Sequence, residues 1–412
     1  MSKNNFYSVI DVGTSKIRTV IMRVGTDGEF KIVGSSVISN SGMKKGKITD
    51  SSLTEEAIKT SISQAARYLE GRPPPISIAI SGINTSCSQT TGITYPNSLE
   101  RSISSKDLEE LVKTSYPTPR EDQSVIHVIP MSFLIDGSRS VRNPVGYHAG
   151  RIQVESYVVF GDQEQVNGLL GAVQSSGVRA KTLVLGPLAA AESSLSRNEK
   201  ELGSVLIDIG AGTTEIAVFK NGSLWYHSCL PIGGNQITND LSVALDIPWD
   251  FAERVKVAWG HANPNSKQCE SEGMVPSLNG RPRKEIKRST VCRPIIDRLE
   301  ETLGLCMLKI QSAGLTKMPV GGIVITGGVA ATNGLDELAK TVFHCPVRIG
   351  TPSGIKGLSA ELNQPSFSTV LGMLLWNLQP SPGVHNFIND SGRPWGHKAL
   401  VSRIKKVMEV KT

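Results

Sequence analysis

The sequence has no long uninterrupted apolar run. One of its longest, "VLGMLLW" at residues 370–376, is far shorter than the ~20 residues that a helix needs to cross a bilayer. The N-terminal residues lack the apolar segment of a secretory signal and pass directly into a strand pattern. These absences predict a protein that is neither secreted nor anchored by a membrane-spanning helix.

Cysteine pairs and nucleic-acid-binding modules are also lacking. The six cysteines, at positions 87, 229, 269, 292, 306 and 345, include no Cys-x-x-Cys spacing, which argues against a zinc site or a disulfide framework and favours a cytoplasm. The basic run "RPRKEIKR" at 281–288 is not accompanied by aromatic residues on which bases could stack, or by a recognisable nucleic-acid-binding motif. We therefore interpret it as a solvated loop and expect no nucleic-acid partner.

The composition that is present is that of a globular protein. Hydrophobic residues make up 39% of the 412-residue chain and charged residues 20%, with a formal net charge of +7. A chain of this length and composition is expected to form two or more domains, each with its own core.

Two stretches about 200 residues apart resemble one another, which indicates two related halves rather than a solenoid. They are "YSVIDVGTSKIRTVIMRVGTDGEF" at 7–30 and "GSVLIDIGAGTTEIAVFKNGSLWY" at 203–226. Each has an apolar strand, an Asp-x-Gly turn with Thr, a second apolar strand and a Gly-containing turn. The second copy ends at Asn221-Gly222, a strong hairpin signal.

The turns have the residue types of a phosphate site. Glycine lets the backbone approach a ligand closely, and a tight turn leaves N–H groups that attract anions. The Asp that ends each first strand would repel phosphate unless a hydrated Mg²⁺ lay between them. A single Asp-x-Gly-Thr is as easily a surface turn, but two matched copies predict a clamp around a nucleotide triphosphate and its metal.

A third motif supports this prediction. In "GGIVITGGVAATNGLDELAKTVFHCPVRIG" at 321–350, an apolar strand runs into Gly327-Gly328, and a helix pattern follows from about Leu335. A glycine pair at a strand end permits close approach of a flat group such as adenine or ribose. The plainer alternative is an ordinary strand-to-helix turn.

In this order, the three motifs resemble those of the actin/Hsp70/sugar-kinase ATPase superfamily. "GMKKGKITD" (42–50), "VIHVIPMSFLIDG…VRNPVGYHAGRIQVESYVVFG" (125–161) and "CLPIGGNQITNDLSVAL" (229–245) are similar to the bacterial cell division family FtsA. The resemblance covers almost the whole chain. It implies an α/β actin-like ATPase fold, with two related halves around a nucleotide cleft, an inserted α+β subdomain and a C-terminal amphipathic helix.

The resemblance also implies the domain organisation. Residues 1–81 and 162–202 would form subdomain 1A, and 82–161 the inserted SHS2-type subdomain 1C. Residues 203–237 and 320–380 would form subdomain 2A, and 238–319 its outer lobe, 2B. Residues 381–394 would be a linker before the tail helix, 395–412. Read independently, 82–161 predicts a helix in "SISSKDLEELVKTS", with a Ser-x-x-Asp/Glu start, and a strand over 151–160.

The resemblance implies nucleotide-binding roles for individual residues, with ATP and Mg²⁺ as the ligands. Asp11 and Asp208 resemble the carboxylates that face the metal through water. Lys16 is the candidate phosphate cation, and Glu253 with Lys256 would meet the nucleoside, although their spacing also fits an exposed ion pair. The complete set is Asp11, Gly13, Thr14, Ser15, Lys16, Asp208, Gly210, Ala211, Gly212, Thr213, Thr214, Gly233, Glu253, Lys256, Gly327, Gly328 and Asn333.

Two departures from the superfamily pattern bear on hydrolysis. In the connecting segment "LVLGPLAAAESSL" at 183–195, Gly186 stands where relatives often carry a Glu that helps to orient the attacking water. The second turn has Ala211 where Gly is more usual, so a change of turn geometry is expected. We therefore assign no catalytic residue and predict slow ATP hydrolysis at most.

The C-terminal stretch "WGHKALVSRIKKVMEV" at 395–410 predicts a basic amphipathic helix. On a helical wheel an arc of about 120° contains Leu400, Val401, Ile404, Val407 and Met408, and outside it lie Lys398, Arg403, Lys405, Lys406 and also Trp395. Such a helix can lie in an anionic lipid interface, although a terminal helix can also dock on its own protein. The predicted membrane-binding residues are Trp395, Leu400, Val401, Arg403, Ile404, Lys405, Lys406, Val407 and Met408.

Together these features predict a structural adaptor rather than an enzyme with rapid turnover. The resemblance implies a peripheral protein on the cytoplasmic face of the inner membrane at the division septum, which polymerises. It would bind the C-terminal peptide of FtsZ through subdomain 2B and other divisome proteins through 1C. The alternatives are a sugar-kinase-like phosphotransferase, for which we find no catalytic base, and a type IV pilus assembly ATPase-like protein. An Hsp70-like chaperone would need a further domain after residue 380.

Overall fold

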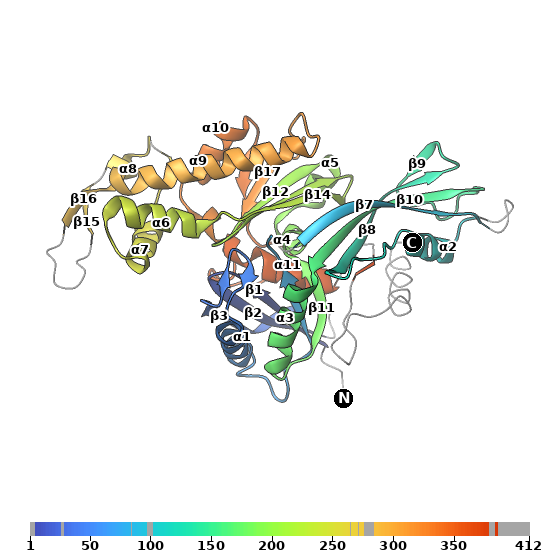
Figure 1. Ribbon diagram of the computed structural model, residues 1–412, viewed down its shortest axis with the longest axis horizontal. Helices are drawn as coiled ribbons and strands as arrows, with labels where there is room; N and C mark the ends of the chain where they lie inside the picture. Colours follow the sequence, from blue (N-terminus) through green and yellow to red (C-terminus); the bar gives the residue numbers. More distant parts are fainter. Residues whose placement is uncertain are drawn as a thin grey trace.

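A computed structural model describes residues 5–25, 29–83, 85–96, 102–263, 265–270, 272–275, 284–378 and 384–385. The predicted membrane-binding helix lies outside these residues. Figure 1 shows two core sheets in the middle of the molecule, a helical lobe at one end and a third sheet at the other. Within the described part of the chain, no helix is long and apolar enough to cross a bilayer.

The first core sheet has the strand order β3-β2-β1-β6-β11. Strand β2 runs antiparallel to its neighbours β1 and β3, whereas β1, β6 and β11 are parallel. The bounds are β1 Asn5–Val12, β2 Lys16–Val24, β3 Phe30–Ser39, β6 Ile76–Ile80 and β11 Ala180–Leu185.

The second core sheet repeats this pattern in the order β14-β13-β12-β17-β18. Again three antiparallel strands are followed by two parallel ones. The bounds are β12 Ser204–Ile209, β13 Thr214–Lys220, β14 Ser223–Leu230, β17 Ile323–Thr326 and β18 Val347–Ile349. The topology thus confirms the two related halves that the sequence repeat predicts.

Two helices join the halves, one of them with mostly small side chains. Helices α4 (Gly186–Ser194) and α11 (Ser368–Leu378) pack so closely that a Cβ on Gly372 would lie 1.8 Å from the carbonyl oxygen of Ala189. Residues of α4 and α11 share one buried cluster with both core sheets. The alanine run "LAAAE", which follows Gly186-Pro187, is therefore the place where the two halves meet.

Helices α1 and α3 and a short hairpin complete the first half, and the following helix α5 packs against β13 of the second core sheet. Asp50 caps α1 by accepting a hydrogen bond from the Leu53 N–H at 3.0 Å, as its position before an amphipathic stretch requires. The bounds are α1 Ser51–Ala65, α3 Gln163–Ser175 and α5 Arg197–Leu202, with the hairpin β4 Met43–Lys44 and β5 Lys47–Ile48.

The inserted part forms a separate sheet in the order β19-β8-β10-β7, with β9 paired to β8. Its bounds are β7 Thr85–Thr94, α2 Ser105–Thr114, β8 Gln123–Ile135, β9 Arg139–Val141, β10 Ile152–Asp162 and β19 Val384–His385. The predicted helix start is confirmed, because Ser104 and Asp107 form a capping box before α2. The predicted strand at 151–160 is confirmed as β10. Strand β19 pairs two residues of the predicted linker with β8.

The outer lobe is helical and is crossed by the long helix α9 (Figure 1). Its bounds are α6 Gly234–Leu245, α7 Trp249–Trp259, α8 Lys267–Glu270, β15 Glu272–Val275, β16 Lys284–Lys287 and α9 Arg288–Ser312. The chain returns to the second core through β17, η1 (Gly328–Ala331) and α10 (Leu335–Phe343), and reaches α11 through η2 (Pro365–Phe367). Helix α6 runs across the expected boundary at 237/238.

Candidate nucleotide site

The two predicted phosphate turns have the same local geometry. In the first, the Gly13 N–H donates to the Lys16 carbonyl at 3.1 Å, and in the second the Gly210 N–H donates to the Thr213 carbonyl at 2.9 Å. Each bond closes a tight turn between antiparallel strands, β1–β2 and β12–β13. Ser15 lies in the first turn, where its carbonyl accepts the Asn40 N–H.

The turns come from different halves but lie against one another. A Cβ on Gly212 would be 2.6 Å from Oγ1 of Thr14, so only glycine fits between them. Gly46, from the "GMKKGKITD" segment, donates its N–H to the same Thr14 oxygen at 3.1 Å. Its own Cβ position is 3.4 Å from Cγ2 of Thr213. Tertiary folding thus brings the repeated motifs to one place.

The strand register places a charged partner beside each predicted metal-facing Asp. Asp11 pairs with Arg18 across β1–β2, and Asp208 pairs with Glu215 at the equivalent position of β12–β13. Arg18 Nη1 lies 3.9 Å from Asp11 Oδ2, and the guanidinium stacks 5.3 Å from the Phe367 ring centroid. The cation beside Asp11 is therefore Arg18, whereas Lys16 is exposed.

The surroundings of Asp11 and Asp208 favour the protonated form of both side chains. Burial, together with the charges of Glu215 and Asp11, raises the pKa of Asp208 to about 7, despite a hydrogen bond of 3.1 Å from Thr369 Oγ1. Burial also raises the pKa of Asp11, although Arg18 opposes this. A cation placed between the two carboxylates would relieve both shifts.

The donor set fits a hydrated Mg²⁺. In the described part of the chain, no group of three or more His, Cys, Asp or Glu could hold a metal directly. Asp11 and Asp208 offer hard oxygen ligands, and burial raises the pKa of both carboxyl groups. Mg²⁺ usually keeps several waters and binds proteins through one or two carboxylates, which agrees with the predicted contact through water.

Gly327 lies directly against the second carboxylate. Its φ is +89°, and a Cβ there would be 2.3 Å from Asp208 Oδ1 and 2.5 Å from the Ile209 carbonyl oxygen. Gly328 has no such neighbour within 4 Å. Asn333 lies further along, where its carbonyl accepts the Ala262 N–H at 2.7 Å. The third motif thus meets the second one at Gly327.

Gly233 and the start of α6 complete the second turn. A Cβ on Gly233 would be 2.6 Å from the carbonyl oxygen of Gly210, and the Gly234 N–H donates to that oxygen at 2.9 Å. Ala211 is not among the described residues with positive φ, and its carbonyl accepts the Asn235 N–H. Ala211 thus avoids the left-handed region, and the change of turn geometry relative to a glycine at this position stays a prediction. Thr214 is buried and bonds the Ile232 carbonyl.

Glu253 and Lys256 form an ion pair beside the start of α6, in which Glu253 is the more exposed partner. Lys256 Nζ lies 2.6 Å from Glu253 Oε2, 2.8 Å from Thr238 Oγ1 and 3.1 Å from the Gly234 carbonyl oxygen. The Lys256 side chain is 15% exposed. Burial lowers the pKa of Lys256, Glu253 opposes this, and Lys16 of the first half lowers it further. Two ammonium groups from opposite halves therefore lie close enough to repel one another.

Sequence reasoning missed Arg18, Glu215 and Thr369. The first two could have been found, because the turns at 13–16 and 210–213 place residues 18 and 215 opposite the two aspartates. Thr369 had no such signal, since it reaches Asp208 from α11.

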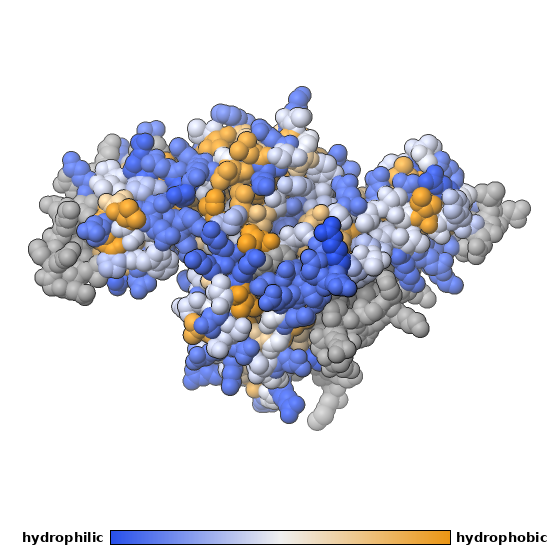
Figure 2. Space-filling model, in the orientation of Figure 1, coloured by the Kyte–Doolittle hydropathy of each residue, from blue (hydrophilic) through white to orange (hydrophobic). Residues whose placement is uncertain are grey.

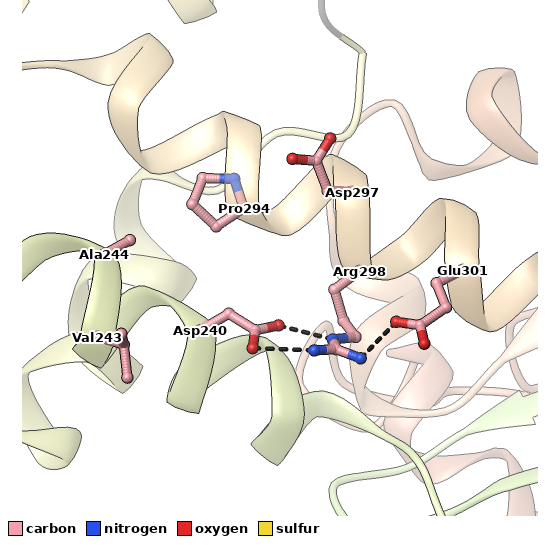
Figure 3. Close-up of a pocket in the computed structure, with 7 residues that line it drawn as sticks. All are labelled: Asp240, Val243, Ala244, Pro294, Asp297, Arg298 and Glu301. Atoms are coloured by element: carbon pink, nitrogen blue, oxygen red, sulfur yellow. Dashed lines mark hydrogen bonds and ion pairs between the residues drawn. The ribbon is translucent and has the colours of Figure 1, made fainter.

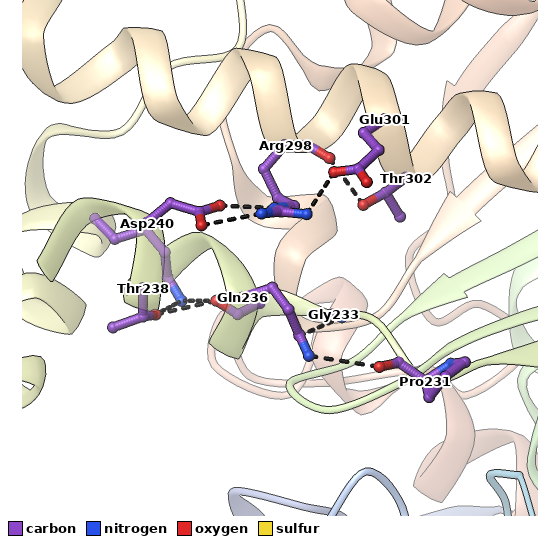
Figure 4. Close-up of polar contacts among 10 residues, drawn as sticks. Pro231, Gly233, Gln236, Thr238, Asp240, Arg298, Glu301 and Thr302 are labelled. Atoms are coloured by element: carbon purple, nitrogen blue, oxygen red, sulfur yellow. Dashed lines mark hydrogen bonds and ion pairs between the residues drawn. The ribbon is translucent and has the colours of Figure 1, made fainter. Parts of the chain in front are cut away.

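A pocket of about 420 Å³ lies outside this site, between α6 and α9 of the outer lobe (Figure 3). Arg298 is held by Asp240 through Nε at 2.6 Å and Nη2 at 3.0 Å, and it also pairs with Glu301. The other lining residues are Val243, Ala244, Pro294 and Asp297. Figure 4 shows that α6 connects the Arg298 ion pairs to the Gly233 turn of the candidate nucleotide site. There the Gln236 side chain accepts the Gly233 N–H at 2.8 Å and donates to the Pro231 carbonyl.

Comparison with solved structures places the fold. The PilM–PilN type IV pilus biogenesis complex matches with a TM-score of 0.64 at 16% identity, covering 91% of this chain and 99% of that one. MreB5 of Spiroplasma citri bound to ADP matches with a TM-score of 0.53 at 12% identity, covering 91% and 96%. At these identities the likeness concerns the fold alone, which is actin-like, as predicted.

Sequence comparison gives the family. The model "Cell division protein FtsA" matches residues 205–372, and "SHS2 domain inserted in FTSA" matches 82–160. FtsA of Borreliella burgdorferi is 33% identical over 382 residues, covering 91% of each chain. FtsA of Pseudomonas aeruginosa is 31% identical, covering 90% and 88%, and that of Escherichia coli K12 is 32% identical, covering 89% and 88%. This chain therefore belongs to the FtsA family of cell division proteins.

Proposed function

We propose that the protein binds ATP with Mg²⁺ between its two halves and acts in division as a membrane-attached, polymerising adaptor for FtsZ. The observation that carries the nucleotide proposal is the contact between the two matched turns, Thr14 against Gly212, with Asp11 and Asp208 behind them. Backbone N–H groups from both turns would hold the phosphates. Bound Mg²⁺ would neutralise phosphate charge, and the two aspartates would orient its water ligands.

The proposed subdomain boundaries rest on the arrangement of the sheets. Subdomains 1A and 2A each contain one core sheet, 1C contains the inserted sheet, and 2B contains α7 to α9 with most of α6. Contacts with further divisome proteins through 1C, and assembly into filaments, are proposed from the family resemblance.

Nucleotide binding is tested with the full chain and fluorescent ATP, with and without Mg²⁺. We expect binding to the wild type to strengthen with Mg²⁺, and Asp208→Asn to remove most of that gain. Asp297→Asn serves as a control of the same chemistry, because Asp297 lies in the outer-lobe pocket. Absence of nucleotide binding by the wild type would refute the proposal.

We propose the α6–α9 pocket as the place where the FtsZ C-terminal peptide contacts subdomain 2B. Figure 2 shows a small hydrophobic patch at this end of the molecule, and the exposed large hydrophobic residues of α6 and α7 are Val243, Trp249 and Val257. The pocket wall has three carboxylates and one guanidinium, and Asp297 is also paired with Arg293 at 3.0 Å. This chemistry suits a peptide with an apolar side chain and a neighbouring basic one.

A matched pair of valines tests the peptide site. Val243 is 83% exposed in the pocket wall, and Val320 is 81% exposed just before β17. Neither side chain belongs to the core, so both Val→Glu variants should fold. We expect Val243→Glu to weaken binding of the FtsZ peptide at least tenfold in fluorescence anisotropy, and Val320→Glu to leave it unchanged. If both variants bound the FtsZ peptide with equal affinity, the pocket would not be the peptide site.

We propose residues 395–412 as the membrane-binding segment. A single short helix with about five apolar side chains should bind lipid weakly and reversibly, whereas a polymer that presents many copies should bind far more firmly. Co-sedimentation with anionic liposomes, with and without this segment, is the test. Equal pelleting of both forms would contradict the assignment.

A further inference from the structure

The end of the first core sheet opposite the phosphate turns carries two loops that lie side by side. The parallel strands β1, β6 and β11 all begin at this end. One loop, 66–75, joins α1 to β6, and the other, 176–179, joins α3 to β11. The Ile76 N–H donates to the Arg179 carbonyl at 2.9 Å and so holds the loops together. We call the surface formed by 66–75 and 176–181 the lower edge, because it lies at the lower end of the molecule in Figure 1.

The lower edge has an excess of basic side chains. Arg67, Arg72 and Arg179 are exposed, and Lys181 is partly exposed. Glu70 is the only acidic residue in the two segments. A cation at position 67 is favoured in any case, because it lies just past the C-terminal end of α1. Arg72 lies five residues further along the loop, so the polarity of α1 does not account for it.

Two tyrosine rings accompany these cations. Arg67 Cζ lies 5.5 Å from the ring centroid of Tyr68, which is 80% exposed. Lys181 Nζ lies 5.0 Å from the ring centroid of Tyr7 on β1. An exposed tyrosine beside a basic side chain suits a membrane–water interface, because the ring has an apolar body with a polar tip and the cation attracts anionic headgroups. The lower edge therefore has the chemistry of a surface that contacts anionic lipid.

The C-terminal part of the chain passes this edge. Helix α11 ends there, since Asn377 Oδ1 accepts hydrogen bonds from Ser77 Oγ at 3.1 Å and from Lys181 Nζ at 3.4 Å. Strand β19 then lies beside β8 and β11. Strand β11 has 6 residues and is about 20 Å long. The nine residues 386–394, which connect β19 to the proposed membrane-binding segment, can span about 30 Å. That segment can therefore reach the level of the lower edge.

We propose that the lower edge is a second lipid-contacting surface, which binds the phosphates of an anionic bilayer while residues 395–412 bind beside it. This inference rests on the proposed membrane attachment. A few basic side chains bind a charged bilayer weakly by themselves. Because a short linker joins the edge to the tail segment, the second contact forms at a high effective concentration and strengthens the first. Two contacts also fix the orientation, with β1, β6 and β11 directed away from the bilayer toward the phosphate turns.

The test measures binding of the full chain to vesicles that contain phosphatidylglycerol, and to vesicles of phosphatidylcholine alone. The double variant Arg67→Gln/Arg72→Gln removes two exposed charges and no core side chain. We expect it to bind the anionic vesicles about tenfold more weakly than the wild type at low salt, with a smaller difference at high salt, where charges are screened. On the neutral vesicles the two proteins should not differ.

A second pair of arginines, in the outer lobe, gives a matched control. Arg254 is exposed and stacks 5.2 Å from the Phe251 ring centroid, as Arg67 does on Tyr68, and the Arg293 side chain is 78% exposed. Arg254→Gln/Arg293→Gln therefore removes the same charge far from the lower edge, and it should leave vesicle binding within twofold of the wild type.

Hydrogen exchange locates the contact. On anionic vesicles the backbone amides of 67–72 should exchange at least fivefold more slowly than in the free protein, whereas those of the β8–β9 turn, 136–138, should not change. A wild type that does not bind anionic vesicles refutes the proposed membrane attachment itself. If the wild type binds and both double variants bind equally well, only the role of the lower edge is overturned. Slowed exchange of 67–72 without vesicles, under conditions of assembly, would assign the edge to contacts between copies of the chain and would also overturn it.

Discussion

Gly327 offers a direct test of how closely the third motif packs against the second aspartate. Replacement by Ala would require φ +89° with ψ 178°, a region that is essentially restricted to glycine and costs about 1–3 kcal/mol for a residue with a Cβ. The added methyl would also lie 2.3 Å from Asp208 Oδ1 and 2.5 Å from the Ile209 carbonyl oxygen. Overpacking of this kind costs about 1–3 kcal/mol.

We therefore expect Gly327→Ala to lower the free energy of unfolding by about 2–6 kcal/mol, as the sum of these two contributions. The next residue is the control, since Gly328 has ordinary φ and no atom within 4 Å of its Cβ position. Gly328→Ala should be neutral or slightly stabilising. Urea unfolding of the full chain measures both variants. Equal midpoints for the two would refute the close packing against Asp208.

Three further predictions concern other parts of the fold. Asp208 has a pKa of about 7, above its usual 3.8, so without metal its contribution to stability is greatest at low pH and is lost as pH rises toward 7. Asp208→Asn should therefore stabilise the metal-free protein more at pH 8 than at pH 5 in thermal melts, and the reverse order would contradict the raised pKa. Gly372→Ala should separate α4 from α11, because its Cβ would lie 1.8 Å from a backbone oxygen, and it should lower the melting temperature markedly. Asp50→Ala removes the α1 cap and should cost about 1 kcal/mol in urea unfolding.

The slow ATP hydrolysis predicted from Gly186 shows the limit of interpreting each sequence position by itself. The sequence shows Gly186 where relatives often carry Glu, and slow hydrolysis is predicted from that position alone. The structure places Glu215 beside the same point, 29 residues later in the chain. A carboxylate that is missing at one position of the chain can thus have a counterpart from a distant strand. Only the packing of β13 against α4 shows that Glu215 lies beside Gly186.

The sequence by itself determined what depends on neighbouring residues. Strand–turn–strand patterns with glycine at 13 and 210, the Ser104–Asp107 cap and the alternation in β10 result from local sterics and hydrogen bonding, so they could be predicted. The repeat also implied two equivalent halves. Tertiary structure decided which side chains meet across those halves: Thr14 with Gly212, Thr369 with Asp208, and Glu215 with Gly82 and His227. These contacts join residues far apart in the chain, and their distances are set by how helices and sheets pack, which no local pattern encodes.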